Sequence, residues 1–151
     1  MTPIPPPTTN VFFNWYNSIM NSEAFESLVS NIGFSPVPEK FRNLISNVAL
    51  IVLDDVPLET RRSMNLPNNQ TLLGFYQGIP LPKRGDYYGS VLPDTITLYR
   101  IPIIRAAALE GLPVQKVIED TIWHEVAHHF GLNEREVRKR EGEIRKLRSR
   151  A

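Results

Sequence analysis

The stretch that decides the fold contains all three histidines of the chain and reads His124-Glu125-Val126-Ala127-His128-His129-Phe130-Gly131-Leu132-Asn133-Glu134. On a helix, His124 and His128 lie on one face, about 6 Å apart along the axis, so both imidazoles can reach one metal ion. Glu125 points away from the ligand positions but into the same cleft, where a general base for metal-activated water has to lie. The stretch therefore predicts a metal-binding helix with a carboxylate placed for proton transfer.

Gly131 and Glu134 extend this pattern. Glycine adopts the left-handed conformation that ends many helices without a side-chain penalty, so the chain can fold back beneath the metal within three residues. Glu134 stands ten residues after His124, where the longer His-Glu-x-x-His-x-x-Gly-x-x-ligand pattern supplies its third ligand. We assign Glu134 that role. His129 is turned about 140° from His124 around the helix, so it should not bind the same ion.

The motif also has plainer interpretations. His124 and His128 could be ordinary polar residues near a helix end, although this explains neither the glycine nor the carboxylate that follows. Asn133 can cap a last helix with Glu136 three residues on, and an acidic residue at 134 would then stabilise the first turn without any metal. The capping role and the ligand role of Glu134 are compatible.

The residues before the motif supply a buried helix face. Pro113 suits the first turn of a helix, and Val114, Val117, Ile118 and Ile122 follow at helical spacing. Such a helix is mostly buried, and apolar packing around a metal site fixes the imidazoles and limits water to the open position. We therefore expect one long helix from Pro113 through the motif.

The chain after the motif is strongly basic. Residues 135–150 hold eight arginines and lysines against three glutamates. Opposite charges recur there at helical spacing, for example at Glu141 and Arg145, which favours an exposed helix over about 133–150. The alternative is a basic surface that contacts nucleic acid or a partner protein.

Three segments are typical of strands. Residues 48–53 are β-branched and apolar on both faces, which predicts a central strand covered on each side. Residues 71–78 predict a second strand, in which Gly74 marks a close approach of another backbone or a ligand. Residues 95–99 alternate polar and apolar side chains, which predicts a strand with one buried face. The aspartates at 54–55 are typical of a solvated turn.

Helical patterns cover three further segments. Residues 23–29 follow the capping residues Asn21 and Ser22 and end at Gly33, and residues 39–45 follow Pro38. A third apolar helical pattern runs over 101–109 and breaks at Gly111. We therefore expect these helices to flank the strands and the metal helix.

Composition narrows the function classes. The 151 residues suit one domain, and 17 basic against 16 acidic residues give no global field that would attract nucleic acid or an anionic membrane. The absence of cysteine excludes disulfides and thiolate metal sites. The longest apolar run, Val48–Leu53, is far too short for a membrane span. The proline-rich residues 1–10 predict a flexible arm rather than a secretory signal, so we expect one domain over 11–151 and a cytoplasmic location.

At this point the chain resembles the small bacterial zincin-like metallopeptidases, a family with a minimal domain and the pattern His-Glu-x-x-His-x-x-Gly-x-x-Asp. Two more segments are similar to that family's other signatures, and they read Leu72-Leu73-Gly74-Phe75-Tyr76-Gln77-Gly78-Ile79-Pro80-Leu81 and Leu92-Pro93-Asp94-Thr95-Ile96-Thr97-Leu98-Tyr99-Arg100. The likeness covers roughly residues 20–135 and places three matching segments in order.

The resemblance implies a compact α/β (α+β) domain, in which a small mixed β-sheet packs against the HExxH helix and flanking helices. It implies that His124 and His128 are the first two zinc ligands, Glu134 the third, and Glu125 the general base. The chain departs from the pattern in having glutamate where the family has aspartate. That side chain is longer by one methylene, or about 1.5 Å of reach, so the backbone below the metal can lie further away.

We therefore expect a zinc-dependent peptidase with one zinc ion that acts on a peptide or protein substrate, without nucleic acid or membrane. Two imidazoles and a carboxylate would leave one zinc position open for water, whose pKa the metal lowers. Glu125 would take the proton as water attacks the carbonyl and pass it to the leaving amine. Tyr88 and Tyr99 are weaker candidates for donating to the developing oxyanion.

A second hypothesis comes from another class of protein. The zinc ion could staple a non-catalytic interaction module, whose basic C-terminal helix at about 133–150 binds nucleic acid or a protein. The lopsided charge after Glu134 motivates this alternative.

Overall fold

A computed structural model describes residues 18, 20–78, 93–132, 135 and 139. Its helices and strands follow the chain in the order α2 (Ser22–Ile32), α3 (Glu39–Arg42), β1 (Val48–Leu53), α4 (Leu58–Ser63), β2 (Gly74–Gln77), β3 (Asp94–Tyr99), α5 (Arg100–Glu110) and α6 (Val114–His129). Helices with a small mixed sheet confirm the expected α+β class. The arm at 1–10, Glu134 and nearly all of the basic segment 133–150 lie outside the described residues.

The three strands form one sheet in the order β1-β3-β2. β1 runs parallel to β3, with Val48 opposite Asp94, and β2 runs antiparallel to β3, with Gly74 opposite Leu98. β3 is therefore the central strand, and the prediction that residues 48–53 form the centre was wrong. Ile51 on the edge strand β1 is 39% exposed.

The half-buried strand expected at 95–99 is instead buried on both faces, since even Thr97 is only 9% exposed. Alternation along a strand reports on the two faces of a sheet and not on its neighbours in the plane, so the pattern could not tell the centre from the edge.

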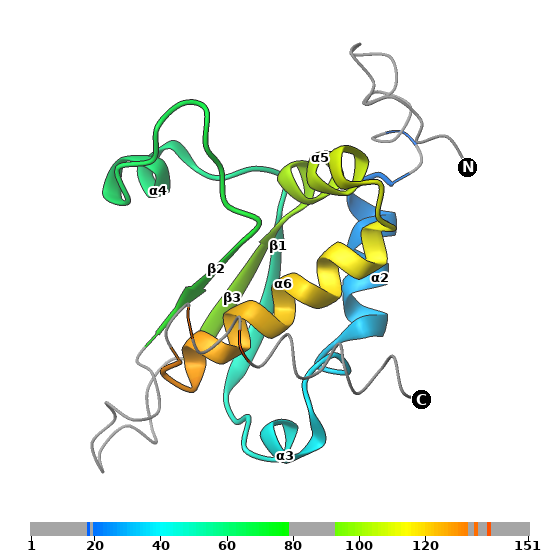
Figure 1. Ribbon diagram of the computed structural model, residues 1–151, viewed down its shortest axis with the longest axis vertical. Helices are drawn as coiled ribbons and strands as arrows, with labels where there is room; N and C mark the ends of the chain where they lie inside the picture. The colour runs from blue at the N-terminus through cyan, green and yellow to red at the C-terminus, as the bar shows by residue number, and fades with distance from the viewer. Residues whose placement is uncertain (1–17, 19, 79–92, 133–134, 136–138, 140–151) are drawn as a thin grey trace.

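Helix α6 packs against β2 and β3, and α2 and α5 flank it, as Figure 1 shows. Its Val117, Ile118, Ile122 and Val126 lie in the main apolar core. They meet core residues from the other elements, among them Phe25, Val29, Ile96, Leu98 and Ile103. The expected apolar face of the long helix is confirmed, and it fixes which side of α6 remains available for a site.

Helix α4 and the end of α3 differ from the sequence prediction. No helix was expected at Leu58–Ser63, and α4 has no buried residue there, so it has no apolar periodicity that a sequence could display. The helix expected over 39–45 ends at Arg42 and continues as a turn. No helix within the described residues is both long and apolar enough to cross a bilayer.

Asp54 ties three elements together at one end of the sheet. Its carboxylate accepts a 2.8 Å bond from Nε of the buried Arg100, which opens α5, and a 3.0 Å bond from the Ser22 hydroxyl of α2. The turn at 54–55 is exposed, as expected. Through these two hydrogen bonds, Asp54 also connects the end of β1 to α2 and α5. The hydrogen bond from Arg100, supported by that from Ser22, lowers the pKa of the Asp54 carboxyl below its ordinary 3.8.

We predict that Asp54→Asn lowers the free energy of unfolding at pH 7 by about 0.5–1 kcal/mol, a range set by the screening of a carboxylate that is 58% exposed. Because the pKa is lowered on folding, this contribution is present above pH 3.8 and is lost as the pH falls through the folded-state pKa. Urea unfolding of both proteins from pH 7 to pH 2.5 measures it. A stability difference that does not shrink at low pH would contradict the assignment.

Candidate metal centre

Helix α6 carries the motif in its last turns, and proline and glycine lie just outside its two ends. Pro113 precedes its first residue, and Phe130 and Gly131 follow its last. Gly131 has φ +76°, the left-handed conformation predicted for this position. The helix therefore carries His124, Glu125 and His128 and then turns sharply aside.

The imidazoles of His124 and His128 lie side by side, as their spacing predicts. Their ring centroids are 5.0 Å apart and the ring planes meet at 69°. Both residues are half-buried, and the His128 side chain is 32% exposed. The two rings therefore lie at the surface of the helix, where a ligand from solution can approach them.

The Glu125 side chain lies beside the His128 ring and against the first residue of β2. Its side chain is 8% exposed, and Oε2 lies 3.3 Å from Nδ1 of His128. Glu125 also lines the same pocket as His124. The carboxylate thus shares the pocket with His124 and lies beside the His128 imidazole, while staying largely shielded from bulk water.

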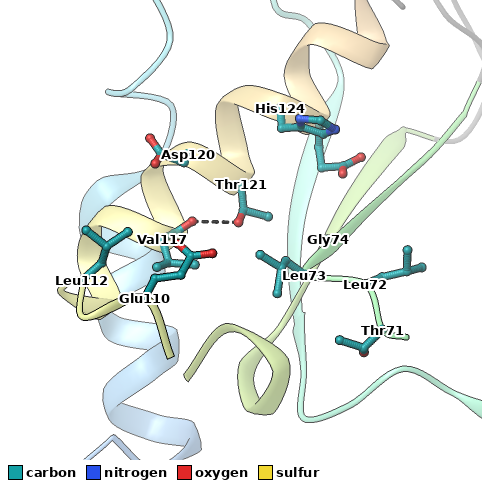
Figure 2. A pocket seen from close by; sticks show the side chains of 11 residues that line it. Thr71, Leu72, Leu73, Gly74, Glu110, Leu112, Val117, Asp120, Thr121 and His124 are labelled. Carbon is teal, nitrogen blue, oxygen red and sulfur yellow. Dashed lines mark hydrogen bonds between the residues drawn. The ribbon is translucent and has the colours of Figure 1, made fainter. Parts of the chain in front are cut away.

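That pocket has a volume of about 350 Å³ and lies between α6, the end of α5 and the residues leading into β2, as Figure 2 shows. Its apolar wall includes Leu73, Leu112 and Val117. Thr121 adds its methyl group to the contact with β2, because its hydroxyl donates a 2.7 Å bond to the Val117 carbonyl. The cavity therefore has an apolar wall that leads to the His124 and Glu125 side chains.

Gly74 allows β2 to begin directly against α6. A Cβ at this position would lie 2.7 Å from Cγ2 of Thr121, 3.1 Å from Cγ of Glu125 and 3.2 Å from the Thr97 carbonyl oxygen. The sequence predicted a close approach at Gly74, and the approaching groups are side chains of α6 and the backbone of β3. This contact seats the Glu125 side chain against the sheet.

The tyrosines considered as donors differ in position. Tyr88 lies outside the described residues, and Tyr99 is 2% exposed. Burial, and then the negative charge of Glu125, raise the pKa of the Tyr99 hydroxyl. Tyr99 therefore stays protonated at neutral pH. It lies in the core near the charge of Glu125, where substrate does not reach it.

His129 lies away from the other two histidines, as expected. It is fully buried, and its Nδ1 donates a 2.9 Å bond to Oδ2 of Asp94 at the start of β3. The Tyr76 hydroxyl from β2 also donates to Oδ2 of Asp94 and lies 3.2 Å from Nδ1 of His129. Tyr76 and Asp94 belong to the two segments that resemble family signatures, but the sequence assigned neither a role, because no local pattern links residues so far apart in the chain.

The donor set suits zinc as far as it is described. Two imidazoles on adjacent helical turns are ligands that zinc accepts, and a nearby carboxylate suits a hydrolytic site. Within 20–78 and 93–132, no three histidine, aspartate or glutamate side chains are grouped so that they could hold a metal ion. Glu134, the expected third ligand, lies outside those ranges, so its assignment stays a prediction.

Comparison with known families agrees with this geometry. A family model described as zincin-like metallopeptidase matches residues 45–144, which contain all three strands, α5, α6 and the motif. No curated protein matches the chain.

We predict that Gly74→Ala lowers the free energy of unfolding by about 1–3 kcal/mol, because the new methyl group collides with Thr121 and Glu125. Urea unfolding followed by tryptophan fluorescence, to which the buried Trp123 contributes, measures the loss. The matched control is Gly74→Ala with Thr121→Ser, which removes the nearest colliding methyl and keeps the hydroxyl. It should recover part of the lost stability, and no recovery would show that the collision is not the cause.

Proposed function

We propose that this chain, which belongs to the zincin-like metallopeptidase family, hydrolyses peptide bonds with one zinc ion. Glu125 would be the general base. The family indicates a zinc-dependent hydrolase. The observation that carries the finer proposal is that His124, His128 and Glu125 lie together on α6, beside a pocket lined by His124 and Glu125.

His124, His128 and Glu134 would hold the ion. The two imidazoles are already adjacent, and the left-handed Gly131 follows the end of α6 three residues before Glu134. When bound, zinc would supply a Lewis acid that polarises the scissile carbonyl and lowers the pKa of water. Three protein ligands leave one position open, which is the arrangement of catalytic rather than structural zinc sites.

Glu125 would move the proton. Its carboxylate is shielded from bulk solvent and lines the cleft beside His124, so it can accept a proton from the attacking water. The same oxygen can then deliver that proton to the nitrogen of the leaving amine. The contact between Glu125 and Gly74 supports this role, because it restricts the side chain to the cleft.

The pocket suits a side chain of a peptide substrate. Its volume of about 350 Å³ exceeds that of a single residue side chain, and its wall of leucine and valine can bury apolar atoms of the substrate. Binding there would position the neighbouring peptide bond over the catalytic carboxylate. A peptide or protein is therefore the substrate class that we propose.

We predict that Glu125→Gln binds zinc as the native protein does and loses at least about 10²-fold of its hydrolysis rate, because the amide cannot accept the proton. A fluorescence-quenched peptide library and zinc analysis of the same samples measure the two properties. The control is Glu119→Gln, the same change on the same helix, where the carboxylate accepts a hydrogen bond from the exposed Gln115. A Glu125→Gln protein with native activity would contradict the mechanism.

We predict that the purified native protein binds about one zinc per chain, that His128→Ala binds none, and that Glu134→Gln binds zinc more weakly. Removal of one of three protein ligands weakens or abolishes the site, and a neutral amide is a poorer ligand than a carboxylate. Elemental analysis after dialysis against a weak chelator measures the content. Equal zinc in all three proteins would place the metal elsewhere.

A further inference from the structure

A buried polar cluster joins the last turn of α6 to the sheet, and it consists of Tyr76, Asp94 and His129. Tyr76 belongs to β2, Asp94 begins β3 and His129 ends α6. Oδ2 of Asp94 accepts a hydrogen bond from the Tyr76 hydroxyl and a 2.9 Å bond from His129 Nδ1. One oxygen atom therefore connects three elements that are far apart in the sequence.

Stability alone is a weak explanation for this cluster. Asp94 is 1% exposed and His129 is 0% exposed. Burying such groups costs several kcal/mol per charge, and well-packed apolar residues of the same volume are often at least as stabilising. What hydrogen bonds add over apolar packing is direction, because they fix the angle between the groups that they join.

Gly78 closes the cluster from the end of β2. A Cβ at this position would lie 2.8 Å from the Asp94 Cβ and closer still to its carboxyl group. Gly74 and Tyr76 are two residues apart in β2, so they share one face of that strand, and Gly78 follows its last residue. That face contacts Thr121 and Glu125 at one end and the cluster at the other.

The cluster adjoins the helix turn that carries His128, the second proposed zinc ligand. His129 follows His128 directly, so a fixed His129 ring sets the rotation of this turn about the helix axis. Metal–ligand distances tolerate about 0.2 Å, and at about 6 Å from the axis of a helix this corresponds to a rotation of only about 2°. A turn whose rotation is fixed in advance therefore brings the His128 imidazole within reach of the ion with little further adjustment.

We propose that Asp94, acting through His129 and oriented by Tyr76, is a positioning residue for the His128 zinc ligand. This inference rests on the proposed function, because it takes His128 to be a ligand. None of the three residues needs to contact the metal or the substrate. They fix the conformation of the last turn of α6 before zinc binds, so zinc binding does not have to order that turn.

The test compares the zinc affinity of a cluster variant with that of a variant that is destabilised elsewhere in the core. The dissociation constant for zinc is measured by competition with a chelator of known affinity in the native protein, Asp94→Asn and Val29→Ala. Val29 is a buried core residue of α2, so its truncation lowers stability without touching the cluster. We expect Asp94→Asn to bind zinc about 10-fold more weakly, at the lower end of the loss that follows removal of a ligand's own hydrogen-bond partner, because Asp94 holds His129 rather than the ligand itself. We expect Val29→Ala to bind within twofold of native.

A second variant keeps the test decisive if Asp94→Asn does not fold. Tyr76→Phe removes only the hydroxyl, and we expect its zinc affinity to fall several-fold. In the absence of metal, we expect its melting temperature to be close to that of Val29→Ala. The inference is overturned if both cluster variants bind zinc within twofold of native, or if Val29→Ala loses as much affinity as they do. Failure of the proposed function is separate, since it would appear as no zinc binding or no peptide hydrolysis by the native protein itself.

Discussion

The burial of one side of α6 is the constraint on which the rest of the structure depends. Val117, Ile118, Ile122 and Val126 are all at most 5% exposed, and each contributes about 1.5–3 kcal/mol when removed from water. The apolar side must face the core, so the helix has one rotation that the fold accepts. That rotation leaves His124 and His128 half-buried, so a ligand can approach them.

One face of β2 completes the arrangement. Gly74 lets the strand touch α6 at Glu125, and Tyr76, two residues on, reaches the buried Asp94 and His129 at the far end of the helix. The strand therefore supports both the proposed base and the turn that carries the second proposed ligand. Packing with no spare room at Gly74 and directed hydrogen bonds at Asp94 restrict the same helix in two ways.

Local geometry explains which features could be predicted from the sequence. The adjacency of His124 and His128, the left-handed Gly131 and the apolar face of α6 follow from helix periodicity within a few residues. The central position of β3 could not be predicted in this way, because strand order depends on contacts between distant segments. Likewise, Asp94 and His129 are 35 residues apart, and nothing in the local pattern of either one indicates the other. The role of Glu134 stays a prediction from spacing.

The most direct test of the central claim is anomalous diffraction at the zinc absorption edge from crystals of the native protein grown with zinc. The account predicts one anomalous peak beside α6, with nitrogens of His124 and His128 about 2.0–2.1 Å from the ion and a carboxylate oxygen of Glu134 at about 2.0–2.2 Å. A crystal with no peak between these histidines, or with zinc held elsewhere on the chain, would contradict it.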